Sequence, residues 1–378
     1  MIRVLAVADS DPNLEWGEGL LGGARDRIDH YSVVLRGPDP PTRAQIRSAA
    51  GRVVPVVGAH RLLALVGELE PDAVLLACSS GVVGALLDYP ALRGPARPVL
   101  IAGAPGIAYP VGPTKLRAMA GIDLLIVHSR TERAAYRRLL VDDTEFADQA
   151  TQIGLATLPA LAGAEVRRGR QALVVFAAQD AVPATARQRR AILDALAAVP
   201  PEYMPVIQAG IPGRRRGSGA PAAYADLEPH PRIEFRHGGA AETLDHAAGC
   251  ATISGTVALQ ALARGIPVLA LDDFGIGPAL GNEVFEDSGL FGGLGDLREA
   301  RFRSPVRDWL LANYFQPAAE ADWLARLDGL VARRNSGALG AATPGQVAPR
   351  ARVARQLRLR LPGISRYADA ARGRRPAN

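Results

Sequence analysis

The stretch CATISGTVALQALARGIPVLALDDFG (Cys250–Gly275) contains the pattern that decides the fold class of this chain. A short apolar run ends at a Ser-Gly-Thr turn, and a segment with helical spacing follows it. A glycine then leads into a second apolar run, which ends in two aspartates. Apolar runs that alternate with helical segments are typical of parallel sheets with crossover helices. The stretch therefore predicts one β-α-β unit of an α/β protein.

The same alternation continues through most of the 378 residues and predicts two tandem doubly wound, Rossmann-like domains that face a cleft. Near-continuous runs of Val, Leu and Ile predict strands that are buried on both faces. We expect an N-terminal domain over residues 1–162 and a C-terminal domain with closing helices over residues 171–335. A polar linker (Ala162–Gln171) separates them, and an arginine-rich tail covers residues 336–378.

The composition is that of a soluble globular protein, with 48% hydrophobic and 22% charged residues. No apolar run reaches the roughly 18 residues that a transmembrane helix needs. The N-terminal segment MIRVLAVADSDP is interpreted as a first strand rather than a signal peptide, because its apolar run is too short. We therefore expect a cytoplasmic protein.

The formal net charge of +6 comes almost entirely from arginine, since Lys115 is the single lysine. Aromatic residues make up 5% of the chain and do not interleave with the basic tail, so no nucleic-acid partner is expected. The basic residues after Pro349 instead suggest peripheral contact with the anionic inner face of a membrane, and disorder is the open alternative. Cys78 and Cys250 lie in apolar segments and are interpreted as core residues.

The Ser254-Gly255-Thr256 turn is a candidate anion site. It lies at the carboxyl end of a strand, which is where ligands bind in doubly wound sheets. A helix begins there, so unpaired backbone N–H groups and the helix dipole favour a phosphate, and Gly255 allows close approach. The alternative is a helix cap that binds nothing.

Other segments of the C-terminal domain flank the same edge. Asp272, Asp273 and Phe274 end the next strand, and a glycine-rich loop leads from them to Asn282, so these residues are expected beside the turn. Gln179 ends the first strand of this domain and is expected at the same edge. A plain turn is the alternative for the loop.

Four carboxylates follow the first strand of the N-terminal domain and are candidates for a catalytic base. Asp11 is the first choice and Glu15 the second, with helix N-capping by Asp9 or Asp11 as the alternative. The other two are Asp9 and Glu18.

A second group of polar residues ends another strand of the N-terminal domain. His128 and Ser129 end this strand, and Glu132 stands at capping-box spacing from Ser129. These residues are interpreted as structural first and as ligand contacts second.

Several motifs together resemble a family of proposed glycosyltransferases from actinobacteria, known mainly as a domain of unknown function, with the GT-B fold. The matching pieces are PGIAYP (Pro105–Pro110), DLLIVHSRTE (Asp123–Glu132), SGTVALQALARGIPVLALDDFG (Ser254–Gly275), NEVFEDSGLFG (Asn282–Gly292) and WLLANYFQ (Trp309–Gln316). They span most of the chain from about residue 100 to residue 316.

The turn is also similar to the Ser-Ser/Thr motif of bacterial sialyltransferases, which holds the phosphate of a CMP-sugar. By that resemblance Ser254 and Thr256 bind the donor phosphate, and Gln179 contacts the donor. The residues expected on the sugar side of the donor are Asp272, Asp273, Phe274 and Asn282. The family's His-Pro motif is found here only at His230-Pro231, before a strand, so His237 at the end of that strand is the better-placed imidazole. Gln260 stands where relatives have a glutamate that holds the ribose hydroxyls.

The resemblance implies a metal-independent glycosyltransferase of polysaccharide biosynthesis. Helix N-termini and basic side chains would balance the leaving group, and Arg214–Arg216 are candidates for this, with a solvated loop as the alternative. The donor is expected to be a CMP-nonulosonate or a UDP- or GDP-hexose, and the acceptor a cell-envelope glycan or a lipid-linked glycan. The alternatives are a nucleotide-sugar 2-epimerase, hydrolysing or non-hydrolysing, and a catalytically silent nucleotide-sugar-binding protein.

Overall fold

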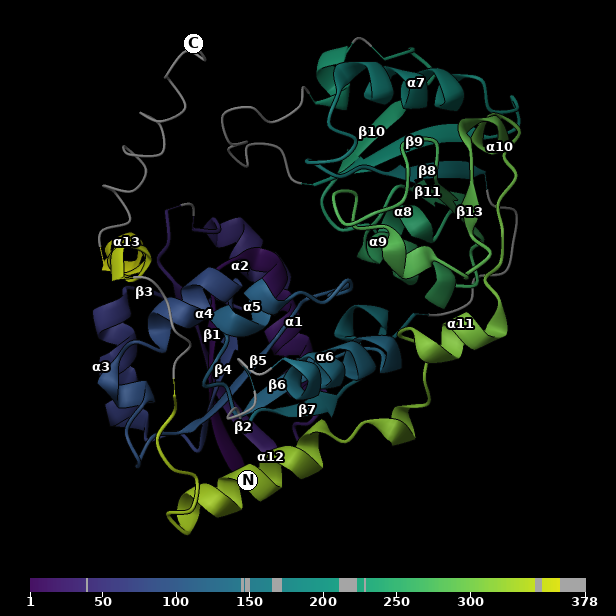
Figure 1. Ribbon diagram of the computed structural model, residues 1–378. Helices are drawn as coiled ribbons and strands as arrows, with labels where there is room; N and C mark the ends of the chain where they lie inside the picture. Colours follow the sequence, from purple (N-terminus) through teal and green to yellow (C-terminus); the bar gives the residue numbers. More distant parts are fainter. Residues whose placement is uncertain are drawn as a thin grey trace. The chain divides into compact units, whose positions relative to one another are not determined.

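The computed structural model describes residues 1–38, 40–143, 146, 150–164, 172–210, 223–227, 229–343 and 349–360. The chain divides into two compact units, one of Met1–Ala160 with Gln316–Asn378 and one of Leu161–Phe315. Each unit is built around one parallel sheet with helices beside it (Figure 1). The prediction of two Rossmann-like domains is confirmed.

The first unit contains a seven-stranded sheet in the order β3-β2-β1-β4-β5-β6-β7, and all its strand pairs are parallel. The order reverses between β1 and β4, which makes the sheet doubly wound. Every residue of β4 is buried, as expected of a strand with helices on both faces. The strands are β1 (Ile2–Ala8), β2 (Ile28–Leu35), β3 (Val56–Val57), β4 (Ala73–Ala77), β5 (Val99–Gly103), β6 (Leu124–Val127) and β7 (Gln152–Leu155).

The helices of the first unit begin and end at residues suited to those positions. A capping box between Thr42 and Gln45 starts α2, and Gly51 ends it with a φ of 66°. The helices are α1 (Asp11–Gly22), α2 (Arg43–Ala50), α3 (Ala59–Leu69), α4 (Ser80–Leu86), α5 (Pro113–Ala118), α6 (Arg130–Asp142), α12 (Trp323–Asn335) and α13 (Pro349–Arg360).

The second unit contains a six-stranded sheet in the order β10-β9-β8-β11-β12-β13, again with parallel pairs. Its order reverses between β8 and β11 in the same way. The strands are β8 (Leu173–Ala177), β9 (Met204–Ala209), β10 (Glu234–His237), β11 (Ala247–Thr252), β12 (Val268–Leu271) and β13 (Phe291–Gly292). The helices are α7 (Ala186–Ala197), α8 (Ala241–Leu244), α9 (Thr256–Ala263), α10 (Leu294–Arg298) and α11 (Arg307–Ala312).

The domain boundary differs from the predicted one, because residues 316–335 pack on the first sheet. Helix α12 contacts β5, β6 and β7, and the backbone N–H of Leu155 donates to Asp322 Oδ1 at 2.8 Å. Trp323 and Leu327 are buried there. The apolar stripe of α12 is visible in the sequence, but a stripe does not show which of two sheets it covers.

The remaining expectations concern the two cysteines, the basic segments and the absence of a transmembrane helix. Cys78 and Cys250 are free, buried thiols, as predicted. The greater part of the predicted linker, Arg214–Arg216, and residues 361–378 of the tail lie outside the described residues. In the part of the chain that the structure describes, no helix is long and apolar enough to cross a membrane.

Candidate functional site

The switch point of the second sheet brings together two of the predicted donor contacts. Strands β8 and β11 are neighbours, with Ala177 and Thr252 in register at their carboxyl ends. The chain leaves β8 toward β9 and leaves β11 toward β12, so the two following loops diverge. Ligands of doubly wound sheets bind at such a switch point. Gln179 follows β8, and the Ser254–Thr256 turn follows β11.

Gly255 gives the turn a shape that other residues rarely adopt. Its φ of 119° and ψ of 160° lie in a region that is essentially restricted to glycine. A Cβ at this position would lie 3.2 Å from Gln179 Nε2, so the glutamine amide packs closely over the turn. Thr252 Oγ1 donates a hydrogen bond to the Ser254 carbonyl oxygen at 2.6 Å and so holds the turn.

Helix α9 presents free backbone donors at this turn. The N–H groups of Thr256 and Val257 have no acceptor among the described residues, as is usual for the first turn of a helix. Thr256 is partly exposed, and Gln260 lies one turn further along the same face. The end of α9 can therefore receive an anion.

The Ser254 side chain makes a contact that the sequence did not predict. Its side chain is buried, and its Oγ donates to the Gly281 carbonyl oxygen at 2.6 Å. The hydroxyl thus joins the turn to the glycine-rich loop that follows β12. Its proton is engaged, so the backbone and Thr256 supply the free donors of the turn.

The predicted sugar-side residues divide into one with a free side chain and three that build the loop. Both amide atoms of Asn282 are used within the loop, by the Gly277 N–H and the Gly275 carbonyl, each at 3.0 Å. Asp273 accepts from the Leu294 N–H at 2.7 Å, and Phe274 packs on the core. The half-buried Asp272 carboxylate has no hydrogen-bond partner within the described residues.

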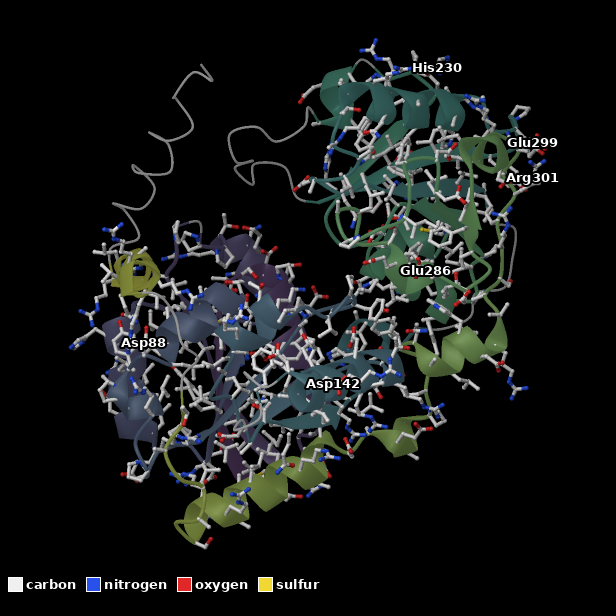
Figure 2. All side chains as sticks on the ribbon, in the orientation of Figure 1. Asp88, Asp142, His230, Glu286, Glu299 and Arg301 are labelled. Atoms are coloured by element: carbon white, nitrogen blue, oxygen red, sulfur yellow. The ribbon has the colours of Figure 1, made fainter. Side chains whose placement is uncertain are left out.

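The two candidate histidines lie at opposite edges of the second sheet. His230 precedes β10 and is exposed on the α7 side of the unit (Figure 2). Its neighbour Arg232 bonds carbonyl groups of the segment between α7 and β9, at the amino ends of the strands. His237 ends β10 at the carboxyl edge, and its Nδ1 lies 3.1 Å from the Gly210 carbonyl oxygen. Of the two, only His237 shares an edge with the turn.

Two buried oxygen atoms in this part of the second unit lack partners. Gln179 Oε1 and Glu283 Oε2 are shielded from solvent, and neither has a hydrogen-bond partner in the structure. Glu283 was not among the predicted site residues, although an acidic residue directly after a glycine-rich loop was a usable signal. Buried acceptors without donors are uncommon in folded proteins, so both are candidate ligand contacts.

Arg189 of α7 is a second residue that the sequence did not single out. Its side chain is fully buried, and its guanidinium donates to the carbonyl oxygens of Pro183 at 2.9 Å and Asp180 at 2.7 Å. The group also lies 4.9 Å from the ring centroid of Tyr224. Arg189 therefore fixes the loop that carries Gln179, and nothing in an arginine-rich helix distinguishes it from its exposed neighbours.

Replacing Arg189 by methionine should destabilise the second unit by about 3 kcal/mol. The buried carbonyl of Pro183 and the partly buried carbonyls of Gln179 and Asp180 would lose a donor, and an unsatisfied buried group costs roughly 1–3 kcal/mol. Urea unfolding measures the change, and Arg190→Met is the matched control because Arg190 is exposed on the same helix. Equal stability of the two variants would show that Arg189 does not hold the loop.

Two of the candidate carboxylates beside the first sheet are held by hydrogen bonds and ion pairs. Asp9 follows β1 and accepts from the Ser79 N–H at 2.9 Å and from Ser79 Oγ at 2.7 Å, while Asn13 Nδ2 donates to its other oxygen. Glu18 contacts Arg52 at 2.8 Å and His30 at 3.3 Å. Both carboxylates are therefore occupied in local structure.

Asp11 and Glu15 lie one turn apart at the start of α1. Gln45 Nε2 lies 3.4 Å from Asp11 Oδ2. Glu15 as a whole is exposed, yet the protein displaces water from its carboxyl group. This desolvation, followed by the negative charge of Asp11, raises the pKa of Glu15 above its usual value. A raised pKa brings a carboxylate nearer to the working range of a general base, so Glu15 is a candidate for that role.

His128, Ser129 and Glu132 form a buried structural cluster. Trp16 Nε1 donates to His128 Nε2 at 2.7 Å, so the other ring nitrogen carries the proton and donates to the Ala156 carbonyl oxygen at 3.1 Å. Glu132 accepts from the backbone N–H groups of Ala108 and His128. Ser129 accepts from the Glu132 N–H at 3.0 Å and caps α6, so the structural interpretation of this group fits the geometry.

The neutral state of His128 predicts a pH-dependent stability. Burial lowers the pKa of His128 from 6.5 to about 4. Between these values the unfolded chain binds a proton that the folded chain does not bind, so the free energy of unfolding falls as the pH drops, by roughly 3 kcal/mol at most. Urea unfolding at pH 7 and pH 4.5 should show this loss, and His128→Gln should reduce it. An unchanged loss in His128→Gln, or an equal reduction in exposed His60→Gln, would contradict the assignment.

Comparison with known proteins places the chain among glycosyltransferase-like folds. The family described as "Putative glycosyltransferase (DUF6716)" matches residues 4–330. No curated protein matches the sequence. In the described ranges, no group of three or more His, Cys, Asp or Glu residues could hold a metal ion.

Solved structures with a similar fold share little sequence with this chain. The S. aureus MnaA–UDP co-structure is 12% identical with a TM-score of 0.53, covering 92% of this chain and 100% of that chain. The Methanocaldococcus jannaschii UDP-GlcNAc 2-epimerase in complex with UDP-GlcNAc and UDP is 11% identical with a TM-score of 0.52, covering 87% and 99%. The spinosyn rhamnosyltransferase SpnG is 14% identical with a TM-score of 0.45, covering 91% and 98%. At these identities the first two likenesses show the fold alone.

Proposed function

The chain belongs to the DUF6716 family of glycosyltransferase-like proteins, and we propose that it transfers a sugar from a nucleotide-activated donor to a glycan or lipid-linked acceptor of the cell envelope. The observation that carries the proposal is the turn at the switch point of the second sheet. It combines the free N–H groups of α9, the glycine-only conformation of Gly255 and a neighbouring amide from Gln179. A phosphate of the donor fits this arrangement, because it needs several convergent donors and close backbone approach.

The unpartnered oxygens support a donor that carries its own hydrogen-bond donors. The amide oxygen of Gln179 and the oxygens of an ionised Glu283 carboxylate accept hydrogen bonds and cannot donate them. The hydroxyl groups of a ribose or a hexose, or the N–H groups of a base, would satisfy them. CMP-nonulosonates and UDP- or GDP-hexoses all have this chemistry, and Gln260 and His237 are further contacts at the same edge of the sheet.

The charge of the leaving nucleotide is balanced without a bound metal in this proposal. The α9 dipole places partial positive charge at the turn. Asp272 remains available for the hydroxyl groups of the sugar, since its carboxylate is free within the described residues. Asp273, Phe274 and Asn282 act indirectly by shaping the loop.

Glu15 is the proposed catalytic base of the first unit. It would take the proton from the acceptor hydroxyl, and Asp11 would keep its pKa raised. The arginine-rich C-terminal segment would hold the protein at an anionic membrane surface, where lipid-linked acceptors are found.

A product assay tests the proposed reaction. The full chain is incubated with each nucleotide sugar, with and without a cell-envelope lipid and glycan extract, and the released nucleotide and the sugar products are identified. A transferase releases nucleotide faster when the extract is present and places labelled sugar in it. A sugar with inverted configuration at C2, formed without extract, would identify an epimerase instead, and donor binding without any product would identify a silent binding protein.

A further inference from the structure

A cavity in the first unit has a lining that suits an anionic lipid. It has a volume of about 550 Å³, within the roughly 300–1,000 Å³ range of small-molecule sites. Its apolar lining includes Leu63, Tyr89 and Leu359. Arg36, His60 and Arg360 also line it, and none of the described residues in the lining is acidic.

The basic groups of this cavity are available to a ligand. Arg36 and His60 are exposed, and neither side chain pairs with a carboxylate in the described part of the chain. Arg360 lies over the Tyr89 ring at 5.6 Å from its centroid and donates to the Tyr89 hydroxyl at 3.3 Å. A second cavity, near α6, is lined by Asp142 and Asp143 as well as Arg138, so its charged residues are of both signs.

Helix α13 closes one side of the cavity and is docked by specific contacts. Gln356 Nε2 donates to the Ala85 carbonyl oxygen at 2.7 Å, and Arg352 contacts Asp88 at 2.8 Å beside the helix (Figure 2). Leu359 is buried in the core of the first unit. The helix is therefore part of this unit, at least as far as Arg360.

The outer face of α13 is apolar and flanked by arginine. Val353 and Leu357 stand one turn apart and are 58% and 51% exposed. Arg350 and Arg360 are exposed at the two ends of the same helix. Exposed apolar residues between basic ones are typical of helices that lie in the interface of an anionic membrane.

We propose that this cavity takes the apolar chain of a phosphate-headed lipid drawn from an anionic bilayer, while α13 lies against the membrane surface. The basic rim contacts the phosphate, and Leu63, Tyr89 and Leu359 contact the chain. The lipid site is independent of the donor site in the second unit, so either can fail alone.

Binding of a short soluble lipid tests the cavity. Calorimetry with decyl phosphate, below the concentration at which it forms micelles, should show binding to the full chain, whereas inorganic phosphate should not bind. Leu63→Trp fills the cavity and should weaken binding about 10-fold or more. Arg36→Glu/Arg360→Glu should weaken it to a similar degree through charge alone, and Arg47→Glu, an exposed arginine on α2, should not. Equal binding of inorganic phosphate, or wild-type affinity in both cavity variants, would overturn the proposal.

Vesicle sedimentation tests the membrane source of the lipid. The full chain should sediment with phosphatidylcholine vesicles that contain phosphatidylglycerol and remain in solution with phosphatidylcholine alone. Leu357→Asp should reduce sedimentation about 10-fold, while Val141→Asp, at an 81% exposed position on α6, should not change it. If Leu357→Asp and the double variant Arg36→Glu/Arg360→Glu both sediment as the wild type does, another part of the chain binds the bilayer.

Discussion

Gly255→Ala is expected to weaken binding of the nucleotide donor roughly 10- to 100-fold. A side chain at a φ of 119° and ψ of 160° costs about 1–3 kcal/mol, and the new Cβ would lie 3.2 Å from Gln179 Nε2. The turn can relieve the strain only by moving, which would displace the free N–H groups of α9 from the phosphate. Calorimetric titration with the nucleotide that binds wild-type protein measures the loss.

A matched glycine variant separates this effect from a general loss of stability. Gly295→Ala in α10 adds a Cβ that meets nothing within 4 Å and requires no positive φ. It should bind the donor as the wild type does. Wild-type affinity in Gly255→Ala would mean that the phosphate does not contact this turn.

Glu15→Gln is expected to lower kcat by about 100- to 10,000-fold with little change in KM, because a positioned general base contributes about that much to the rate. Transfer to water uses the same base, so nucleotide released from the donor is a sufficient measure while the acceptor is being identified. Glu68→Gln, which removes an exposed carboxylate on α3, is the control. Equal rates for Glu15→Gln and Glu68→Gln would exclude Glu15 as the base.

The pH dependence of the same reaction tests the part assigned to Asp11. The base must be ionised, so the rate should rise with pH through the raised pKa of Glu15. Asp11→Asn removes a negative charge that raises this pKa, so the rise should move to lower pH. A rise that stays in place, or moves to higher pH, would contradict the coupling of the two carboxylates.

The fold was largely predictable because the strands of both sheets are buried on both faces. Runs such as AVLLA in β4 and LVVFA in β8 can be recognised from composition alone. The assignment of α12 was not predictable, because its buried face, which includes Trp323 and Leu327, suits either sheet equally well. Only long-range contacts, such as that of Asp322 with Leu155, decide between the two sheets.

The place of the candidate residues in the fold was predictable, but the hydrogen bonds that each of them makes were not. The rule that ligands bind at the carboxyl ends of strands led to the Ser254–Thr256 turn and to Gln179. The Ser254 and Asn282 side chains hold the loop by hydrogen bonds to backbone groups, and a backbone partner carries no sequence signal. Arg189 was missed for the same reason, because its partners are also backbone carbonyl groups.

The most direct test of the central claim is a thermal-shift titration of the full chain with CMP, UDP, GDP and their sugars, repeated with Gly255→Ala and Gly295→Ala. A ligand that binds only the folded protein raises Tm. At a free ligand concentration of 100 times Kd, it adds about 2.7 kcal/mol to the free energy of unfolding. One nucleotide should raise the Tm of the wild type and of Gly295→Ala while leaving that of Gly255→Ala nearly unchanged. No shift with any nucleotide, or an equal shift in all three proteins, would contradict a donor site at this turn.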